Sequence, residues 1–263
     1  MNFKLNVENL KCKDVLKDIN LNIQEGTINI LMGNNGSGKT MLLKCIFGLI
    51  DYEGFIKYSN KILNNDDIDK SRKKLGIYLG INNLENKNVF LNIIEPLNNL
   101  NYDNTKSKNK VYEITKKLGI ENLLYKEVNS LSHSEKKIVS FAQSIIHEPK
   151  IIMIDGLFDS IDIYYKNRVI NYLNQLKKTK KCIIILTTNN SEDLWLADNL
   201  IIIKNGKILV NDSVYKLIED ENIFYKNDIK LPFIIDLSYK LKVYDLIDKL
   251  IYTPLEMVDE IWQ

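Results

Sequence analysis

The sequence of 263 residues has little of several features that define whole classes of protein. It contains only 4 prolines, 11 glycines and 3 cysteines, which excludes collagen-like and disulfide-stabilised secreted chains. Its 36 basic and 34 acidic residues leave a formal net charge of only +2. Nucleic-acid-binding domains usually carry a clear basic excess, so we expect no nucleic acid partner. The hydrophobic fraction of 45% still supplies a substantial core and excludes a disordered chain.

Long apolar runs are missing as well. No uninterrupted apolar stretch approaches the ~20 residues that a membrane-spanning helix needs. Residues 1–10 lack the apolar segment of a signal peptide. The cysteines, Cys12, Cys45 and Cys182, have no metal-type spacing and fit a reducing compartment. We therefore expect a cytoplasmic protein that does not span a membrane but can lie against a membrane protein.

Arginine and alanine are scarce, with two residues of each, whereas lysine, asparagine and isoleucine are abundant. A genome rich in A and T favours the codons of these three residues, and we take this as the main cause of the bias. Side chains under weak selection drift in such a genome. A motif that is intact is therefore more informative than one that is lost.

The hydropathy pattern predicts an α/β fold. Residues 3–7 and 15–23 alternate like strands, and residues 55–63 resemble a hairpin. The continuous apolar runs 27–32, 151–154 and 182–186 are typical of parallel strands buried on both faces. Amphipathic segments predict helices, among them one at 41–50, one at 110–118, one ending before Pro149, and a crossover helix at 164–176. Asn205 and Gly206 predict a tight hairpin between 201–203 and 208–210.

A glycine-rich segment follows the apolar run 27–32 and precedes a helix. Glycines allow the backbone N–H groups to converge on phosphate oxygens, and the helix directs its positive end at the same charge. The lysine neutralises the β- and γ-phosphates, and the threonine hydroxyl binds Mg²⁺. This pattern is a P-loop, here called the phosphate loop: Gly33, Asn34, Asn35, Gly36, Ser37, Gly38, Lys39 and Thr40.

Besides the threonine hydroxyl, such loops need a carboxylate at the end of a neighbouring strand to hold Mg²⁺. Asp155 ends the apolar run 151–154. A strand-terminating aspartate is a weak signal alone, but it becomes strong beside a phosphate loop. We therefore predict that Thr40 and Asp155 form the Mg²⁺ site of an ATP-binding protein.

From residue 3 to about 210, the order of motifs resembles that of an ABC-type ATPase, the nucleotide-binding subunit of ABC transporters. The resemblance rests on the phosphate loop, Leu131–Glu135, Asp155, the D-loop ending at Asp162, and residues 187–189. It implies a P-loop NTPase fold with a RecA-like core, an antiparallel β subdomain and a helical subdomain at about 80–148, all within residues 1–211. It also implies ATP and Mg as ligands and a second ATPase subunit as partner.

The tail resembles the C-terminal extension of energy-coupling-factor transporter ATPases, through residues 230–241 and 253–256. This implies that residues 212–263 are an accessory or dimerisation extension. It also implies uptake of vitamins or metal ions with an integral membrane coupling protein, and a peripheral position on the inner face of the cell membrane. The surface for that membrane partner is expected at residues 79–94 and in the following helices.

The signature departs from the family sequence Leu-Ser-Gly-Gly-Gln. In the family, this segment contacts the γ-phosphate bound by the opposite subunit. We expect bulk in place of the two glycines to weaken that contact, while Ser132-x-x-Glu135 still forms a helix capping box. The signature residues here are Ser132, His133, Ser134 and Glu135.

Three positions linked to hydrolysis in the family are also changed, and the residue that stacks on adenine is missing between Leu10 and Val15. Gly156 stands where the family has the glutamate that polarises water, Asn189 stands at the switch histidine, and Gly80 at the Q-loop glutamine. General-base catalysis contributes ~10²–10⁴-fold. We therefore expect binding of Mg-ATP with weak or lost hydrolysis. The alternatives are a non-catalytic pseudo-ATPase that acts as an interaction module, and an ABC protein that acts away from membranes.

Overall fold

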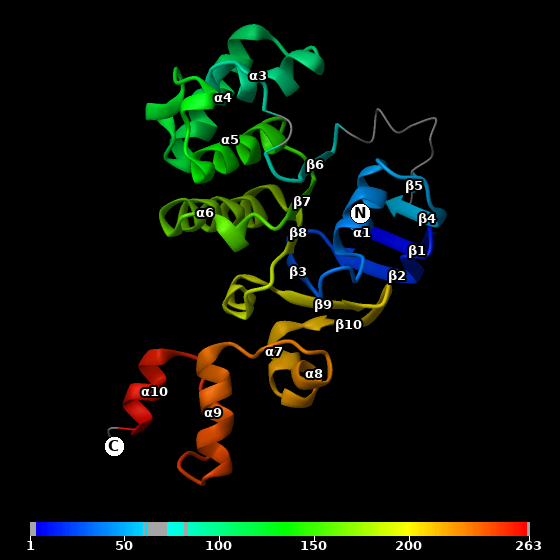
Figure 1. Cartoon of the computed structure of the whole chain (residues 1–263), viewed down its shortest axis with the longest axis vertical. Coiled ribbons are helices and arrows are strands. Elements are labelled where there is room, and N and C mark those ends of the chain that lie inside the picture. Colours follow the sequence, from blue (N-terminus) through cyan, green and yellow to red (C-terminus); the bar gives the residue numbers. More distant parts are fainter. Residues whose placement is uncertain (1–3, 60, 63–72, 82–83, 262–263) are drawn as a thin grey trace.

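The structure is a computed structural model that describes residues 4–59, 61–62, 73–81 and 84–261. Two sheets lie on either side of helix α1, and helices cover the outer face of the larger sheet (Figure 1). The predicted α/β class is therefore confirmed. Phe3 and Leu63, the ends of two predicted β segments, lie outside the described residues.

The larger sheet has the strand order β10-β9-β3-β8-β7-β6. Its strands are parallel except for β10, which pairs antiparallel with β9. Every residue of β3 and β8 is buried, which explains why their sequences do not alternate. The strands are β3 (Ile28–Met32), β6 (Leu75–Tyr78), β7 (Ile151–Asp155), β8 (Ile183–Thr187), β9 (Asn199–Lys204) and β10 (Lys207–Ser213).

The smaller sheet is antiparallel, with the order β2-β1-β4-β5. Alternate residues of β2 are buried, so one face of this sheet packs on α1 (Lys39–Phe47) and the other faces solvent. Helix α1 in turn contacts one face of the larger sheet. The phosphate loop, which leads into α1, is therefore held between two sheets. The strands are β1 (Lys4–Cys12), β2 (Leu16–Gln24), β4 (Glu53–Tyr58) and β5 (Lys61–Ile62).

Four helices on the other side of the larger sheet share the main hydrophobic core with it, and Phe141 is one of the largest fully buried side chains there. They are α3 (Val89–Asn99), α4 (Asn104–Leu118), α5 (His133–Ile145) and α6 (Ile163–Lys180). The sequence pattern did not single out α3. Its apolar residues do have helical spacing, and the Asn88 side chain accepts a hydrogen bond from Leu91 N at 2.9 Å as its N-cap. Pro96 inside this helix obscured the signal.

The hairpin between β9 and β10 turns at Asn205 and Gly206, both of which have positive φ angles, as predicted. The Gly206 N–H donates to the Ser37 carbonyl oxygen at 3.1 Å, and the Gly206 carbonyl accepts from Lys17 N at 2.8 Å. The turn therefore connects the phosphate loop with β2. A side chain at Gly206 would overlap the Val15 carbonyl oxygen.

The C-terminal region forms short helices, as predicted: α7 (Val214–Ile218), α8 (Glu221–Lys226), α9 (Phe233–Val243) and α10 (Pro254–Ile261). Its first part shares the main core through Phe224, Leu231 and Ile235. Its last part has a small separate cluster of Ile247, Ile251 and Met257. Strand β10 runs to Ser213, past the predicted boundary at 211, and the division into two domains stays a prediction.

Two further expectations concern chemistry and membranes. Cys12, Cys45 and Cys182 are buried and form no disulfide bond with one another. Within the described part of the chain, no helix combines the length and apolar character needed to cross a membrane.

Candidate functional site

The phosphate loop joins β3 to α1. Gly33, Gly36 and Gly38 have φ angles of +152°, +79° and +111°, which L side chains rarely adopt. A Cβ at Gly33 would overlap the Ile203 carbonyl oxygen, and one at Gly38 would lie 2.6 Å from Leu16 Cδ2. Nothing lies within 4 Å of a Cβ at Gly36. Two of these glycines are thus required by packing as well as by backbone conformation.

Lys39 occupies the first turn of α1 and folds its ammonium group back over the phosphate loop. Its Nζ donates to the carbonyl oxygens of Gly33 and Asn34. Burial lowers the pKa of Lys39, while the carboxylates of Asp155 and Asp159 act in the opposite direction. The ammonium is therefore positioned where an incoming phosphate group would replace the backbone carbonyls as its partner.

Thr40 and Asp155 meet at the end of β7. Thr40 Oγ1 donates to Asp155 Oδ2 at 2.6 Å, and Thr187 Oγ1 donates to Asp155 Oδ1 at 2.6 Å. The Thr187 hydroxyl in turn accepts from Gly156 N at 2.9 Å. Three elements, α1, β7 and β8, therefore fix the Asp155 carboxylate beside the hydroxyls of Thr40 and Thr187.

These groups fit a magnesium ion bound together with phosphates. Mg²⁺ prefers oxygen ligands and is usually held by one or two protein groups plus substrate phosphates. Hydroxyl and carboxylate oxygens are such ligands. In the same loop, the buried Ser37 Oγ lacks a hydrogen-bond partner among the described residues. An unsatisfied buried hydroxyl costs free energy, and an anionic ligand in the loop would supply its partner.

Gly156 and Asn189 lie beside this centre, together with a residue that sequence reasoning missed. Gly156 has a φ of +64°, and the nearest atom to a Cβ there would be Asp159 Oδ2, at 3.8 Å. Asp159 Oδ1 accepts from the backbone N–H of Asn189 at 3.1 Å, and its Oδ2 from Asn189 Nδ2 at 3.3 Å. The motif comparison included Asp159 in the D-loop, Asp159 to Asp162, but assigned it no role of its own.

The signature residues lie at the start of α5 and contact the D-loop rather than the phosphate loop. The predicted capping box is present, with both Ser132–Glu135 hydrogen bonds formed. Ser134 is buried and its hydroxyl accepts from Asp162 N at 3.2 Å, whereas His133 is exposed. The expected weakening of the contact with a partner subunit's nucleotide stays a prediction. Ser134 turns toward Asp162, and only the His133 side chain projects outward.

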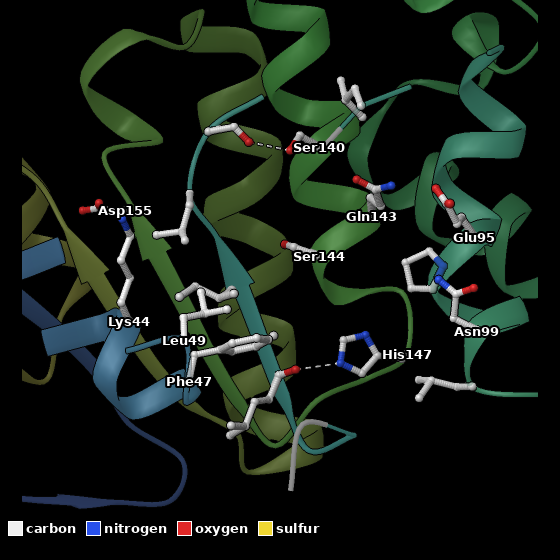
Figure 2. Close-up of a pocket in the computed structure, with 18 of the residues that line it drawn as sticks. Lys44, Phe47, Leu49, Glu95, Asn99, Ser140, Gln143, Ser144, His147 and Asp155 are labelled. Carbon is white, nitrogen blue, oxygen red and sulfur yellow. Dashed lines mark hydrogen bonds between the residues drawn. The ribbon is translucent and has the colours of Figure 1, made fainter. Parts of the chain in front are cut away.

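Gly80, with a φ of +97°, lies in a groove of about 1050 Å³ between α1 and the helical region (Figure 2). Its carbonyl accepts from Ser140 Oγ at 2.7 Å. At the far end of the groove, His147 Nε2 lies 2.9 Å from the Leu75 carbonyl oxygen, and burial lowers the pKa of His147. Thr40 and Asp155 also line the groove, so it opens onto the phosphate loop.

Comparisons with known proteins agree with this geometry. The family model described as ABC transporter matches residues 16–158. The energy-coupling factor transporter ATP-binding protein EcfA1 of Mesomycoplasma hyopneumoniae is 30% identical over 254 residues, which cover 95% of this chain and 91% of the relative. The methionine import ATP-binding protein MetN of Clostridium tetani is 30% identical, over 84% of this chain and 70% of its own.

Solved structures share the fold. The structure of cbiO1 from Clostridium perfringens, part of the ABC transporter complex cbiONQ, has a TM-score of 0.76 and 25% identity, over 90% of this chain and 99% of its own. A dimeric ATP-binding cassette with bound ADP and phosphate has a TM-score of 0.72 and 23% identity, over 80% of this chain and 98% of its own. The expected P-loop NTPase fold is thereby confirmed, and the chain belongs to the ATP-binding subunits of the ABC transporter family.

Proposed function

We propose that the chain binds Mg-ATP as the ATPase subunit of an importer of the energy-coupling-factor class, which takes up vitamins or metal ions. The observation that carries this proposal is the joint placement of Lys39, Thr40 and Asp155 around a loop whose Ser37 hydroxyl lacks a partner among the described residues. All four positions that the motif specifies are present despite the strong compositional bias: Gly33, Gly38, Lys39 and Thr40. When bound, Mg²⁺ would supply positive charge at the transferring phosphate.

We also propose that this subunit hydrolyses ATP slowly. Gly156 has no side chain with which to polarise water, and its backbone conformation disfavours any other residue. Asn189 can donate a hydrogen bond to a phosphate but carries no charge. Losing a well-placed base costs ~10²–10⁴-fold in rate. The signature segment is expected to slow hydrolysis at the partner subunit's site as well, because His133 projects from the helix start that would contact ATP there.

The proposed partners are a second ATPase subunit and an integral membrane coupling protein, which would place the chain on the inner face of the membrane. The groove beside Gly80 supports a contact with the membrane protein. It lies between the core and the helical region and reaches Asp155. Within the predicted contact segment 79–94, the described residues Leu79, Gly80, Leu84 and Glu85 line this groove. Residues 82 and 83 lie outside the described residues.

A binding titration tests the Mg-ATP site. Affinity for a fluorescent ATP analogue is measured with Mg²⁺ and with a chelator, for the full chain and for Asp155→Asn. We expect Mg²⁺ to increase the affinity of the original chain for the analogue. In Asp155→Asn we expect this Mg²⁺-dependent increase to be smaller by roughly 10-fold or more. Asp245→Asn, in the exposed tail, removes the same charge as a control. An unchanged Mg²⁺ dependence in Asp155→Asn would contradict the assignment.

Purification of the tagged full chain from the cells that make it, in mild detergent, tests the transport role. We expect an ATPase partner and an integral membrane protein to co-purify in fixed proportions. Recovery of the chain without any membrane protein would favour the alternative, a pseudo-ATPase that acts as an interaction module.

A further inference from the structure

A carboxylate lies next to the position of the missing catalytic glutamate. Asp159 is in the short 3₁₀ helix (Phe158–Ser160) that follows β7, three residues beyond Gly156. This turn brings Asp159 Oδ2 to 3.8 Å from where the first side-chain carbon of residue 156 would stand. Asp159 is exposed, and its charge acts on Lys39 together with that of Asp155. Its carboxylate therefore lies beside position 156 and is open to solvent.

Asn189 holds this carboxylate in place. The backbone N–H of Asn189 donates to Oδ1 at 3.1 Å, and its side-chain amide donates to Oδ2 at 3.3 Å. The Thr188 hydroxyl, 3.1 Å from Oδ1, lies closer to Asp193 Oδ2, at 2.6 Å. Hydrogen bonds donated by Asn189 therefore orient both oxygens. Each oxygen keeps a lone pair for a further partner.

We infer that Asp159 is the catalytic carboxylate of this site and that Asn189 is its positioning residue. This rests on the proposed binding of Mg-ATP. The oxygen of a water molecule attacks the γ-phosphorus, and one proton of that water passes to the Asp159 carboxylate. The bond between the γ-phosphorus and its bridging oxygen breaks, and the electron pair leaves with ADP. Inorganic phosphate is the second product, and Asp159 then returns its proton to solvent.

The proposal explains two departures from the family together. The acid has moved from position 156 to position 159, and Asn189, in place of histidine, supplies the two donors that orient it. An arrangement with a displaced acid is compatible with slow turnover. It differs from complete loss of catalysis, because a carboxylate remains beside position 156.

The test uses the full chain, in excess over γ-labelled Mg-ATP, and compares it with Asp159→Asn and the control Asp245→Asn. We expect Asp159→Asn to lower the single-turnover rate by about 100-fold or more. Loss of a negative charge near the terminal phosphate should also shift the ratio of ATP to ADP affinities toward ATP, by roughly 5-fold. This shift can be measured without any turnover, and it reports whether the carboxylate lies near the terminal phosphate.

A second variant, Asn189→Ala, leaves the acid in place but removes the side-chain donor. We expect its single-turnover rate to fall by a larger factor than its affinity for Mg-ATP. The inference is overturned if Asp159→Asn keeps the original rate, if the ATP-to-ADP preference does not change, or if the original chain binds Mg-ATP without releasing phosphate. Failure of the original chain to bind Mg-ATP at all would instead refute the proposed function, and this inference with it.

Discussion

Replacing Gly206 with alanine is expected to destabilise the chain by on the order of 3–5 kcal/mol. Gly206 has a φ of +76°, and its Cα faces the Val15 carbonyl, so an added methyl group would overlap that oxygen. The overlap can be relieved only by moving the hairpin. The Gly206 N–H donates to the carbonyl oxygen of Ser37 in the phosphate loop, and the Gly206 carbonyl accepts from Lys17 N. Because the hairpin holds the phosphate loop in this way, we expect the same change to weaken Mg-ATP binding.

Urea denaturation of Gly206→Ala beside Gly26→Ala separates overlap from backbone strain. Gly26 has a similar φ of +71°, but the nearest atom to a Cβ there would be 3.8 Å away. Gly26→Ala should therefore cost only about 1 kcal/mol from its left-handed conformation. Equal losses of unfolding free energy in the two variants would show that the contact with Val15 yields readily.

Replacing Lys39 with alanine is expected to weaken Mg-ATP binding by roughly 10–150-fold. The ammonium lies over the phosphate loop, and hydrogen bonds to charged groups are worth about 1.5–3 kcal/mol each. Burial lowers the pKa of Lys39 because it disfavours the charged ammonium. The negative charge of bound phosphates would favour the ammonium and so offset this effect.

Titration with the fluorescent ATP analogue measures this effect. Lys207→Ala, on the exposed side of β10, serves as the control for loss of one positive charge. If Lys39→Ala binds as tightly as Lys207→Ala, the chain has no nucleotide-binding role at this loop.

The parts of the site that the sequence revealed are those set by local pattern. Apolar runs predicted the buried strands, and the spacing of glycines and Lys39 predicted the phosphate loop. Asp155 followed from its place at the end of a strand, because the carboxyl ends of parallel strands meet at one edge of a sheet. Such features can be predicted from a few neighbouring residues, because they do not depend on contacts between distant parts of the chain.

The parts that the sequence missed depend on tertiary contacts. Asp159 approaches position 156 only because a 3₁₀ turn follows β7, and its link to Asn189 joins residues 30 positions apart. The orientation of Ser134 depends on Asp162 in the same way. A comparison of motifs registers which residue is lost at a position, but it does not register which neighbour approaches the vacated space.

The C-terminal region has a thermodynamic consequence. Leu231 accepts a hydrogen bond from the Ser191 hydroxyl, and the N–H of Phe233 donates to Glu192, just beyond Asn189. The side chains of Phe224, Ile229, Leu231 and Ile235 are buried in the core shared with the large sheet. This part of the tail and the nucleotide-binding core therefore form one cooperative unfolding unit. Only the last segment, with its own cluster around Ile251, can open locally at a smaller free-energy cost and leave the ATP site intact.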